Sequence, residues 1–291
     1  MEMPQAAYSK QHSGKATLEP FPASCLPFAV YCLLPMLRNI KLIIEYDGTN
    51  YHGWQSQAGS GRATIQETLE QAIEKLTGER CAIVSSGRTD AGVHALGHVA
   101  NFPTSGPIPG QAFAPALNRL LPADIRVTSS EEVPAGFHAR FSATEKTYQY
   151  RILNRPAPSA LLRDRAWHVD RKLNVAAMRR AAAVLVGAHD FSAFRSAGCG
   201  AKTAVRRLRS LTVKRSGDLV DITLTADAFL MHMARNIAGT LVEAGLGRFS
   251  PEDVKRILRS RDRQRAGKTA PARGLTLLSV AYGRRKRRPA R

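Results

Sequence analysis

The chain has 291 residues, of which 44% are hydrophobic, so it is long and apolar enough to bury a core, and a wholly disordered chain is excluded. Lysine and arginine number 43 against 23 acidic residues, which gives a net charge of +20. Solubility alone needs a magnitude of about 2–8 in a small domain. The charge therefore favours a polyanionic partner, with nucleic acid first, although arginine enrichment of a whole genome is an alternative.

The two ends of the chain differ from its body. Residues 21–37 carry no charge and resemble a short anchor, but Pro22, Pro27 and Pro35 argue against a helix there. We expect residues 1–36 to be a disordered or misassigned extension, with Met36 as the start. Residues 284–288 are all basic, and without them the net charge is still +15. We expect residues 284–291 to form a basic tail.

The first half of the body mixes strands and helices. Alternating apolar residues predict a strand from Arg38 to a turn at Asp47-Gly48. Thr64, with Glu67 three positions later, predicts a helix start, and Gly78 predicts its end. Further strands are expected at 81–84, 98–102 and 125–133, with a glycine-rich loop between the first two and a short helix at 115–121.

The second half repeats this rhythm. Alternation predicts a strand at 146–153, and Ser216-Gly217-Asp218 predicts a hairpin turn between strands 204–215 and 219–226. Helices are expected at 174–186, 229–244 and after Ser250-Pro251, and a last strand at 274–283. We therefore predict an α+β fold with two similar lobes, residues 37–140 and 141–283, each a mostly antiparallel sheet covered by helices, with a cleft between them.

The most specific feature is the loop SSGRTDAGVH at residues 85–94. Arg88 and Asp90 lie two positions apart, so their side chains share one face of an extended segment. Gly87 and Gly92 permit backbone conformations that other residues resist. An isolated pair of this kind is most often a structural salt bridge, so the spacing alone leaves its function open.

The stretch GRTDAGVHALGHVANF resembles the active-site signature of the TruA family of tRNA pseudouridine synthases. Other segments resemble that family in the expected order: RNIKLIIEYDGTNYHGWQ, FHARFSATEKTYQYRILN, HDFSAFRS, FLMHMARNIAGTLVEAGLGR and GLTLLSVAY. The resemblance covers about residues 38–283. It implies the pseudouridine synthase fold and an isomerase that converts uridine in tRNA to its C-glycoside.

The resemblance also implies roles for four residues. Asp90 matches the catalytic aspartate, acting either as a nucleophile on the sugar or as a base that removes a ribose proton. Arg88 is expected to contact phosphate or the flipped nucleotide, and Arg195 to pair with Asp90 and contact substrate. Tyr148 is expected to stack on uracil, whereas Tyr150 is expected in the core. The reaction transfers no electrons, so neither a cofactor nor a metal is implied.

The resemblance further implies uridines 38, 39 and 40 of the tRNA anticodon stem-loop as targets, and a homodimer. Four isolated cysteines without a metal or disulfide pattern favour a reducing, cytoplasmic location and no membrane. On the helix at 229–244, side chains off the apolar stripe are expected to face RNA: Met231, His232, Arg235 and Asn236.

Three alternatives remain at this point. One is an RNA-binding protein without catalytic activity, which the charge fits equally well. Another is a pseudouridine synthase with other target uridines. The third is a zinc hydrolase based on His94 and His98, which would need both on one helix with a third ligand, and the glycine-rich setting argues against that helix.

Overall fold

The computed structural model describes residues 37–55 and 62–283, so the predicted extension 1–36, including Cys25 and Cys32, and the tail 284–291 lie outside the described residues. The first half contains β1 (Arg38–Tyr46), α1 (Ile65–Thr77), β2 (Val84–Ser85), β3 (His94–Thr104), α2 (Phe113–Leu117) and β4 (Ile125–Val133). The second half contains β5 (Ala143–Leu153), β6 (Trp167–His168), α3 (Val175–Ala183), β7 (Gly187–Asp190), β8 (Val205–Ser216), β9 (Leu219–Ala226), α4 (Met233–Gly245), α5 (Pro251–Ser260) and β10 (Leu275–Tyr282).

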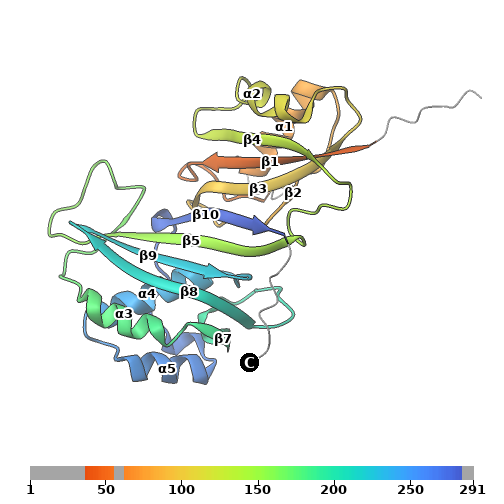
Figure 1. Cartoon of the computed structure of the whole chain (residues 1–291). Helices are drawn as coiled ribbons and strands as arrows, with labels where there is room; N and C mark the ends of the chain where they lie inside the picture. The colour runs from red at the N-terminus through yellow and green to blue at the C-terminus, as the bar shows by residue number, and fades with distance from the viewer. Residues whose placement is uncertain (1–36, 56–61, 284–291) are drawn as a thin grey trace, which may run out of the picture. The chain divides into compact units, whose positions relative to one another are not determined.

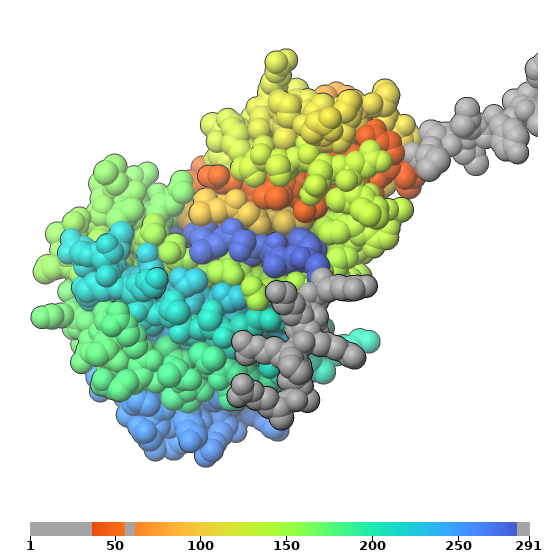
Figure 2. Space-filling model, viewed as in Figure 1, coloured from red at the N-terminus to blue at the C-terminus, as the bar shows by residue number. Residues whose placement is uncertain are grey.

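The strands of both halves form one continuous sheet in the order β4-β1-β3-β10-β5-β9-β8-β7, with β2 paired to β3 and β6 to β5 (Figure 1). Most pairs are antiparallel, and β3 and β10 form a short parallel joint through Thr276 opposite His94 and Leu277 opposite Ala95. Figure 2 shows β10 as the blue band between gold β3 and green β5. The α+β class is confirmed, but the two sheets expected are joined into one, because the last strand inserts between the halves. The lobe boundary at residue 140 stays a prediction.

Most of the predicted helix ends are confirmed. The Thr64 side chain accepts a hydrogen bond from the Glu67 amide at 3.3 Å, and Gly78 ends α1 in the left-handed conformation. Asn174 caps α3, and Ser250 forms a reciprocal capping box with Asp253.

Several predicted elements are shorter than expected. The helix expected at 115–121 spans Phe113–Leu117, and the helix expected at 174–186 ends at Ala183. The strand at 81–84 is reduced to Val84–Ser85, since only these two residues pair with β3. The helix expected at 229–244 begins at Met233, because His232 has a φ of 59°, which lies outside the right-handed helical region.

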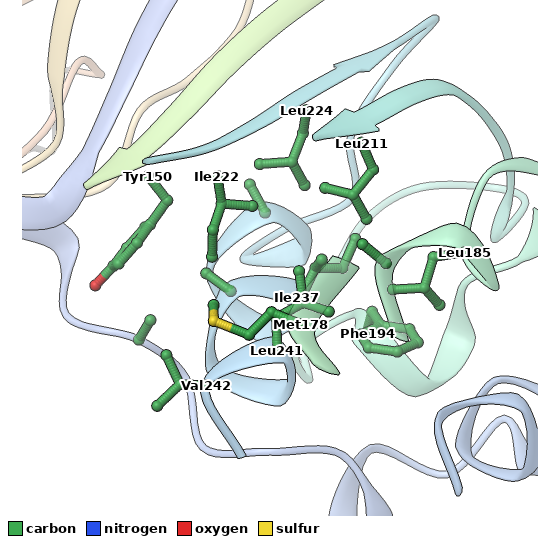
Figure 3. Close-up of a cluster of buried hydrophobic side chains, with 14 of the residues drawn as sticks. Tyr150, Met178, Leu185, Phe194, Leu211, Ile222, Leu224, Ile237, Leu241 and Val242 are labelled. Carbon is green, nitrogen blue, oxygen red and sulfur yellow. The ribbon is translucent and has the colours of Figure 1, made fainter. Parts of the chain in front are cut away.

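Two apolar clusters flank the joint between the halves. One lies in the first half around Phe102, Phe113 and the β1 and α1 side chains. The other lies in the second half, where Ile237 and Leu241 of α4 pack against Ile222, Leu224 and Met178 (Figure 3). Tyr148 packs against both clusters, and Val93, near the end of the glycine-rich loop, packs into the second-half cluster. This loop is therefore anchored by apolar burial on the side of α4.

Polar side chains are also buried beneath the loop. The Tyr46 hydroxyl lies 2.8 Å from Thr89 Oγ1 and 3.2 Å from His98 Nδ1, and the His98 ring stacks on Trp54 at 3.9 Å. Burial lowers the pKa of His98 to about 3, with the charge of Lys146 adding to the effect. His98 is therefore a neutral core residue at physiological pH.

Helix α4 is held by an unusually close neighbour. A Cβ atom placed on Gly239 would lie 1.8 Å from the Lys268 carbonyl oxygen, so only glycine allows residues 267–270 to cross the helix at this point. The same segment receives a hydrogen bond from Arg235 Nε at the Ala270 oxygen, at 2.8 Å. The crossing thus orients the largely sheltered, charged side chain of Arg235 on α4.

We predict that His98 makes the protein less stable in acid. The native ring stays neutral down to a pKa of about 3, whereas the unfolded ring binds a proton below its ordinary value of 6.5. The unfolded state binds more protons between these values, so stability is complete above pH 6.5 and is lost as pH falls toward 3. His98 should account for a loss of about 2 kcal/mol between pH 7 and 5.

Urea unfolding at both pH values measures this loss. The variant His98→Gln should be less stable at pH 7 but should lose about 2 kcal/mol less on acidification than the parent. An unchanged slope in His98→Gln would show that His98 does not titrate in this way.

We predict that Gly239→Ala destabilises the protein by about 1–3 kcal/mol, because the added methyl group would displace residues 267–270 and outweighs the small gain in helix propensity. A Cβ atom placed on Gly136 would meet no other atom within 4 Å, so Gly136→Ala serves as a control with little expected effect. Thermal unfolding of both variants tests this. Equal melting temperatures would contradict the close crossing at Gly239.

Candidate active site

The glycine-rich loop lies between β2 and β3 and is fixed by backbone hydrogen bonds at both ends. The Ser86 amide donates to the Val99 oxygen at 2.7 Å, and the Trp54 amide donates to the Thr89 oxygen at 3.1 Å. The Val93 amide donates to the Asp90 oxygen at 3.1 Å, which closes a turn in which Gly92 has a φ of 76°. Asp90 therefore lies in a short rigid turn that needs glycine at position 92.

Lys146 on β5 supports the same loop from below. Its Nζ donates to the Ser86 oxygen at 2.6 Å, and a Cβ atom on Gly87 would lie 2.7 Å from this Nζ. Burial lowers the pKa of Lys146 to about 8, with the charge of Arg140 adding to the effect. The loop is thus hydrogen-bonded to the second half as well as to its own half.

The carboxylate of Asp90 meets α4 of the second half. Asp90 Oδ2 accepts a hydrogen bond from Arg235 Nη1 at 2.7 Å and lies 3.3 Å from His232 Nε2. The Asp90 side chain is 32% exposed and that of Arg235 is 15% exposed. The pair is therefore sheltered while the carboxylate stays open to solvent, as a group that must meet a ligand requires.

The structure corrects one expected pairing. The family resemblance predicts Arg195 as the partner of Asp90, but the arginine that forms an ion pair with Asp90 among the described residues is Arg235. Arg195 is half-buried beside Asp190. The pKa of Asp190 is lowered chiefly by a hydrogen bond from Ser192, with smaller effects from the charges of Arg261 and Arg195. The role of Arg195 in substrate contact stays a prediction.

Tyr148 and Arg88 lie in different surroundings. Tyr148 is half-buried on β5, and its ring meets that of Phe229 edge-on at 4.9 Å. Burial and the charge of Asp90 raise the pKa of Tyr148, so its hydroxyl keeps its proton.

Arg88 is exposed, and its side chain makes no hydrogen bond or ion pair within residues 37–55 and 62–283. It is free to contact a ligand.

The polar residues in the first turn of α4 and just before it divide into two groups. His232 and Arg235 lie off the apolar stripe of the helix, as expected. Their side chains contact Asp90. The expectation that Asn236 faces RNA is wrong, because this residue is fully buried and its Nδ2 donates to the Phe194 oxygen at 2.8 Å. His232 and Arg235 are three residues apart, and this spacing is the sequence signal that both side chains lie on the same side of the helix start.

The two histidines of the zinc alternative lie on a strand, not a helix. His94 and His98 belong to β3; His94 Nδ1 lies 3.0 Å from Asp47 Oδ1, and its Nε2 lies 2.8 Å from the Asp164 oxygen. In the part of the chain that the structure describes, no group of three or more histidine, cysteine or acidic side chains could hold a metal ion. Both histidines thus contact structural neighbours, and they do not lie on one helix as the zinc-hydrolase alternative requires.

Comparison with known proteins matches this chain to one family. A family model described as tRNA pseudouridine synthase matches residues 42–142 and 181–283, which include Asp90, Arg195 and Arg235. The tRNA pseudouridine synthase A of Acetivibrio thermocellus is 52% identical over 246 residues, covering 84% of this chain and all of that protein. The tRNA pseudouridine synthase A 2 of Clostridium tetani is 49% identical over 85% of this chain. The tRNA pseudouridine synthase A of Caldicellulosiruptor bescii is 48% identical over 84% of this chain, and the match covers the whole of each relative. The chain belongs to the tRNA pseudouridine synthase family.

Proposed function

We propose that this chain is an isomerase that converts uridine to pseudouridine in tRNA, at positions 38, 39 and 40 of the anticodon stem-loop, with Asp90 as its catalytic residue and without a cofactor. The observation that carries the proposal is the partly exposed Asp90 carboxylate, held at 2.7 Å by Arg235 beside Tyr148. The family membership supports the substrate class. The charge of +20 supports a polyanionic substrate.

The chemistry is an isomerisation in which atoms and electrons balance. The N1–C1′ bond of uridine breaks, the uracil turns, and a C5–C1′ bond forms; C5 then loses its hydrogen to solvent and N1 gains a proton. Asp90 begins the reaction either by adding to C1′ or by taking a proton from the ribose. Both routes use an ionised carboxylate oxygen that is free to reach the sugar.

The surrounding residues fit this task. Asp90 Oδ2 is engaged by Arg235 and His232, whereas Oδ1 accepts no hydrogen bond within the described residues. Tyr148 offers a half-buried aromatic face on which uracil can stack, an interaction worth about 1–3 kcal/mol per base. Because its hydroxyl stays protonated, Tyr148 can donate a hydrogen bond to the base or to the carboxylate.

The target uridine must leave the base stack to reach Asp90, which costs a few kcal/mol. Contacts from basic side chains to phosphates offset this cost, and we assign Arg88 and Arg195 to contacts with the RNA. We further propose a cytoplasmic homodimer that binds the RNA across both subunits. No helix in the described residues is long and apolar enough to cross a membrane.

We predict that Asp90→Asn abolishes activity while leaving tRNA binding intact, because the amide keeps the size of the carboxylate but lacks its charge. The measurement is the release of tritium from tRNA labelled at uracil C5. Asp170→Asn, at an exposed aspartate, is the control and should release tritium like the parent.

The tritium measurement distinguishes two outcomes. Release by the parent and the control, but not by Asp90→Asn, supports a carboxylate-dependent isomerase. Tight binding without release by the parent would favour the RNA-binding protein without catalytic activity.

Transcripts with cytidine at position 38, 39 or 40 then test the targets, and release that persists when all three are replaced would show that the target uridines lie elsewhere.

We predict that Arg88→Ala weakens tRNA binding without changing protein stability, since the side chain is exposed and unbonded within the described residues. Loss of one phosphate contact should make the slope of log affinity against log salt concentration shallower by about one. Arg119→Ala removes another arginine, on the C-terminal side of α2, and is the matched control. Equal slopes for both variants would exclude a phosphate contact by Arg88.

A further inference from the structure

His232 has a backbone conformation that residues other than glycine rarely adopt. Its φ is 59°, in the left-handed region, immediately before α4. Such strain persists only where surrounding contacts hold it, and it gathers at functional sites. Two backbone contacts hold it here: the Asn236 amide donates to the His232 oxygen at 2.9 Å, and the Ser196 amide donates to the Met231 oxygen at 3.2 Å.

This conformation points the His232 ring between two groups. On one side, Nδ1 lies 2.7 Å from Ser196 Oγ. On the other side, Nε2 lies 3.3 Å from Asp90 Oδ2, the same oxygen that Arg235 binds at 2.7 Å. The side chain is 29% exposed, so it forms part of the wall of the site.

The two contacts determine which ring nitrogen carries the proton. A carboxylate only accepts, so attraction to Asp90 requires a proton on Nε2. In a neutral ring Nδ1 is then the acceptor, and the Ser196 hydroxyl donates to it. Ser196 thus stabilises the tautomer that attracts Asp90, in the manner of a supporting partner behind a histidine.

We propose that His232, supported by Ser196, is a positioning residue for the reaction. With Arg235 it holds Oδ2 of Asp90 from two sides, so that Oδ1 is the oxygen presented to the ribose. The contact of 3.3 Å is long for a hydrogen bond, and catalytic contacts in ligand-free structures are commonly long and tighten when substrate binds. The inference rests on the proposed function of Asp90 and adds a residue that orients it.

Three substitutions at position 232 separate this role from a structural one. His232→Gly keeps the left-handed conformation without strain but removes the ring. His232→Gln places an amide at the reach of Nε2, toward Asp90, in a residue that resists the conformation. His232→Asn tolerates the conformation but places its amide at the reach of Nδ1, toward Ser196.

The measurement is the single-turnover rate of tritium release, with tRNA affinity and melting temperature measured alongside. We expect His232→Gly and His232→Asn to lower the rate about 10–100-fold with unchanged affinity, as expected when a reacting group is misplaced by about 1 Å. His232→Gln should retain the rate within about fivefold. A rate retained by His232→Asn and lost by His232→Gln, or a parental rate in His232→Gly, would overturn the positioning role.

A second readout does not depend on activity. In the proton and nitrogen NMR spectrum of the full chain, the His232 ring should show a proton on Nε2, and its Nε2 signals should shift in Asp90→Asn. Ring signals that are identical in the parent and in Asp90→Asn would overturn the contact itself. A parent that releases no tritium, with these shifts present, would instead refute the proposed function and leave the contact standing.

Discussion

The site depends on one ion pair between segments far apart in the chain. Asp90 follows β2 in the first half, and Arg235 lies on the first turn of α4 in the second half, with 2.7 Å between their charged atoms. A charge pair this sheltered stabilises only when both partners are held in place, because an unpaired buried charge is costly. Much of the structure around it serves to hold these two side chains.

Each side of the pair has its own support. Below Asp90, the loop is fixed by Thr89 against Tyr46, by Ser86 against Lys146, and by Val93 in the second-half core. Behind Arg235, residues 267–270 cross α4 at Gly239. The parallel joint of β3 and β10 makes the two halves one sheet, so the supports share a single frame. Such a frame keeps a reacting carboxylate in place before substrate arrives.

Local features could be predicted from the sequence, and long-range pairings could not. Thr64, Gly78, Asn174 and Ser250 marked helix ends, because capping depends on neighbours within a few residues. The insertion of β10 between β3 and β5 had no local signal, since an alternating pattern indicates a strand but not its partners. The same limit explains why Arg195 is predicted as the partner of Asp90 and Arg235 is not. Both arginines lie in segments that resemble the family, and only the fold decides which guanidinium reaches Asp90.

The assignment of this site is tested by a crystal structure of the protein bound to tRNA that carries 5-fluorouridine at position 39. Fluorine takes the place of the hydrogen that C5 must lose, so the turned base cannot complete the reaction and is trapped. We predict that the target base lies out of the stack against Tyr148, with a carboxylate oxygen of Asp90 bonded to, or within about 3.5 Å of, the ribose. The ion pair with Arg235 should remain. RNA bound with its ribose far from Asp90 would contradict the assignment of this site.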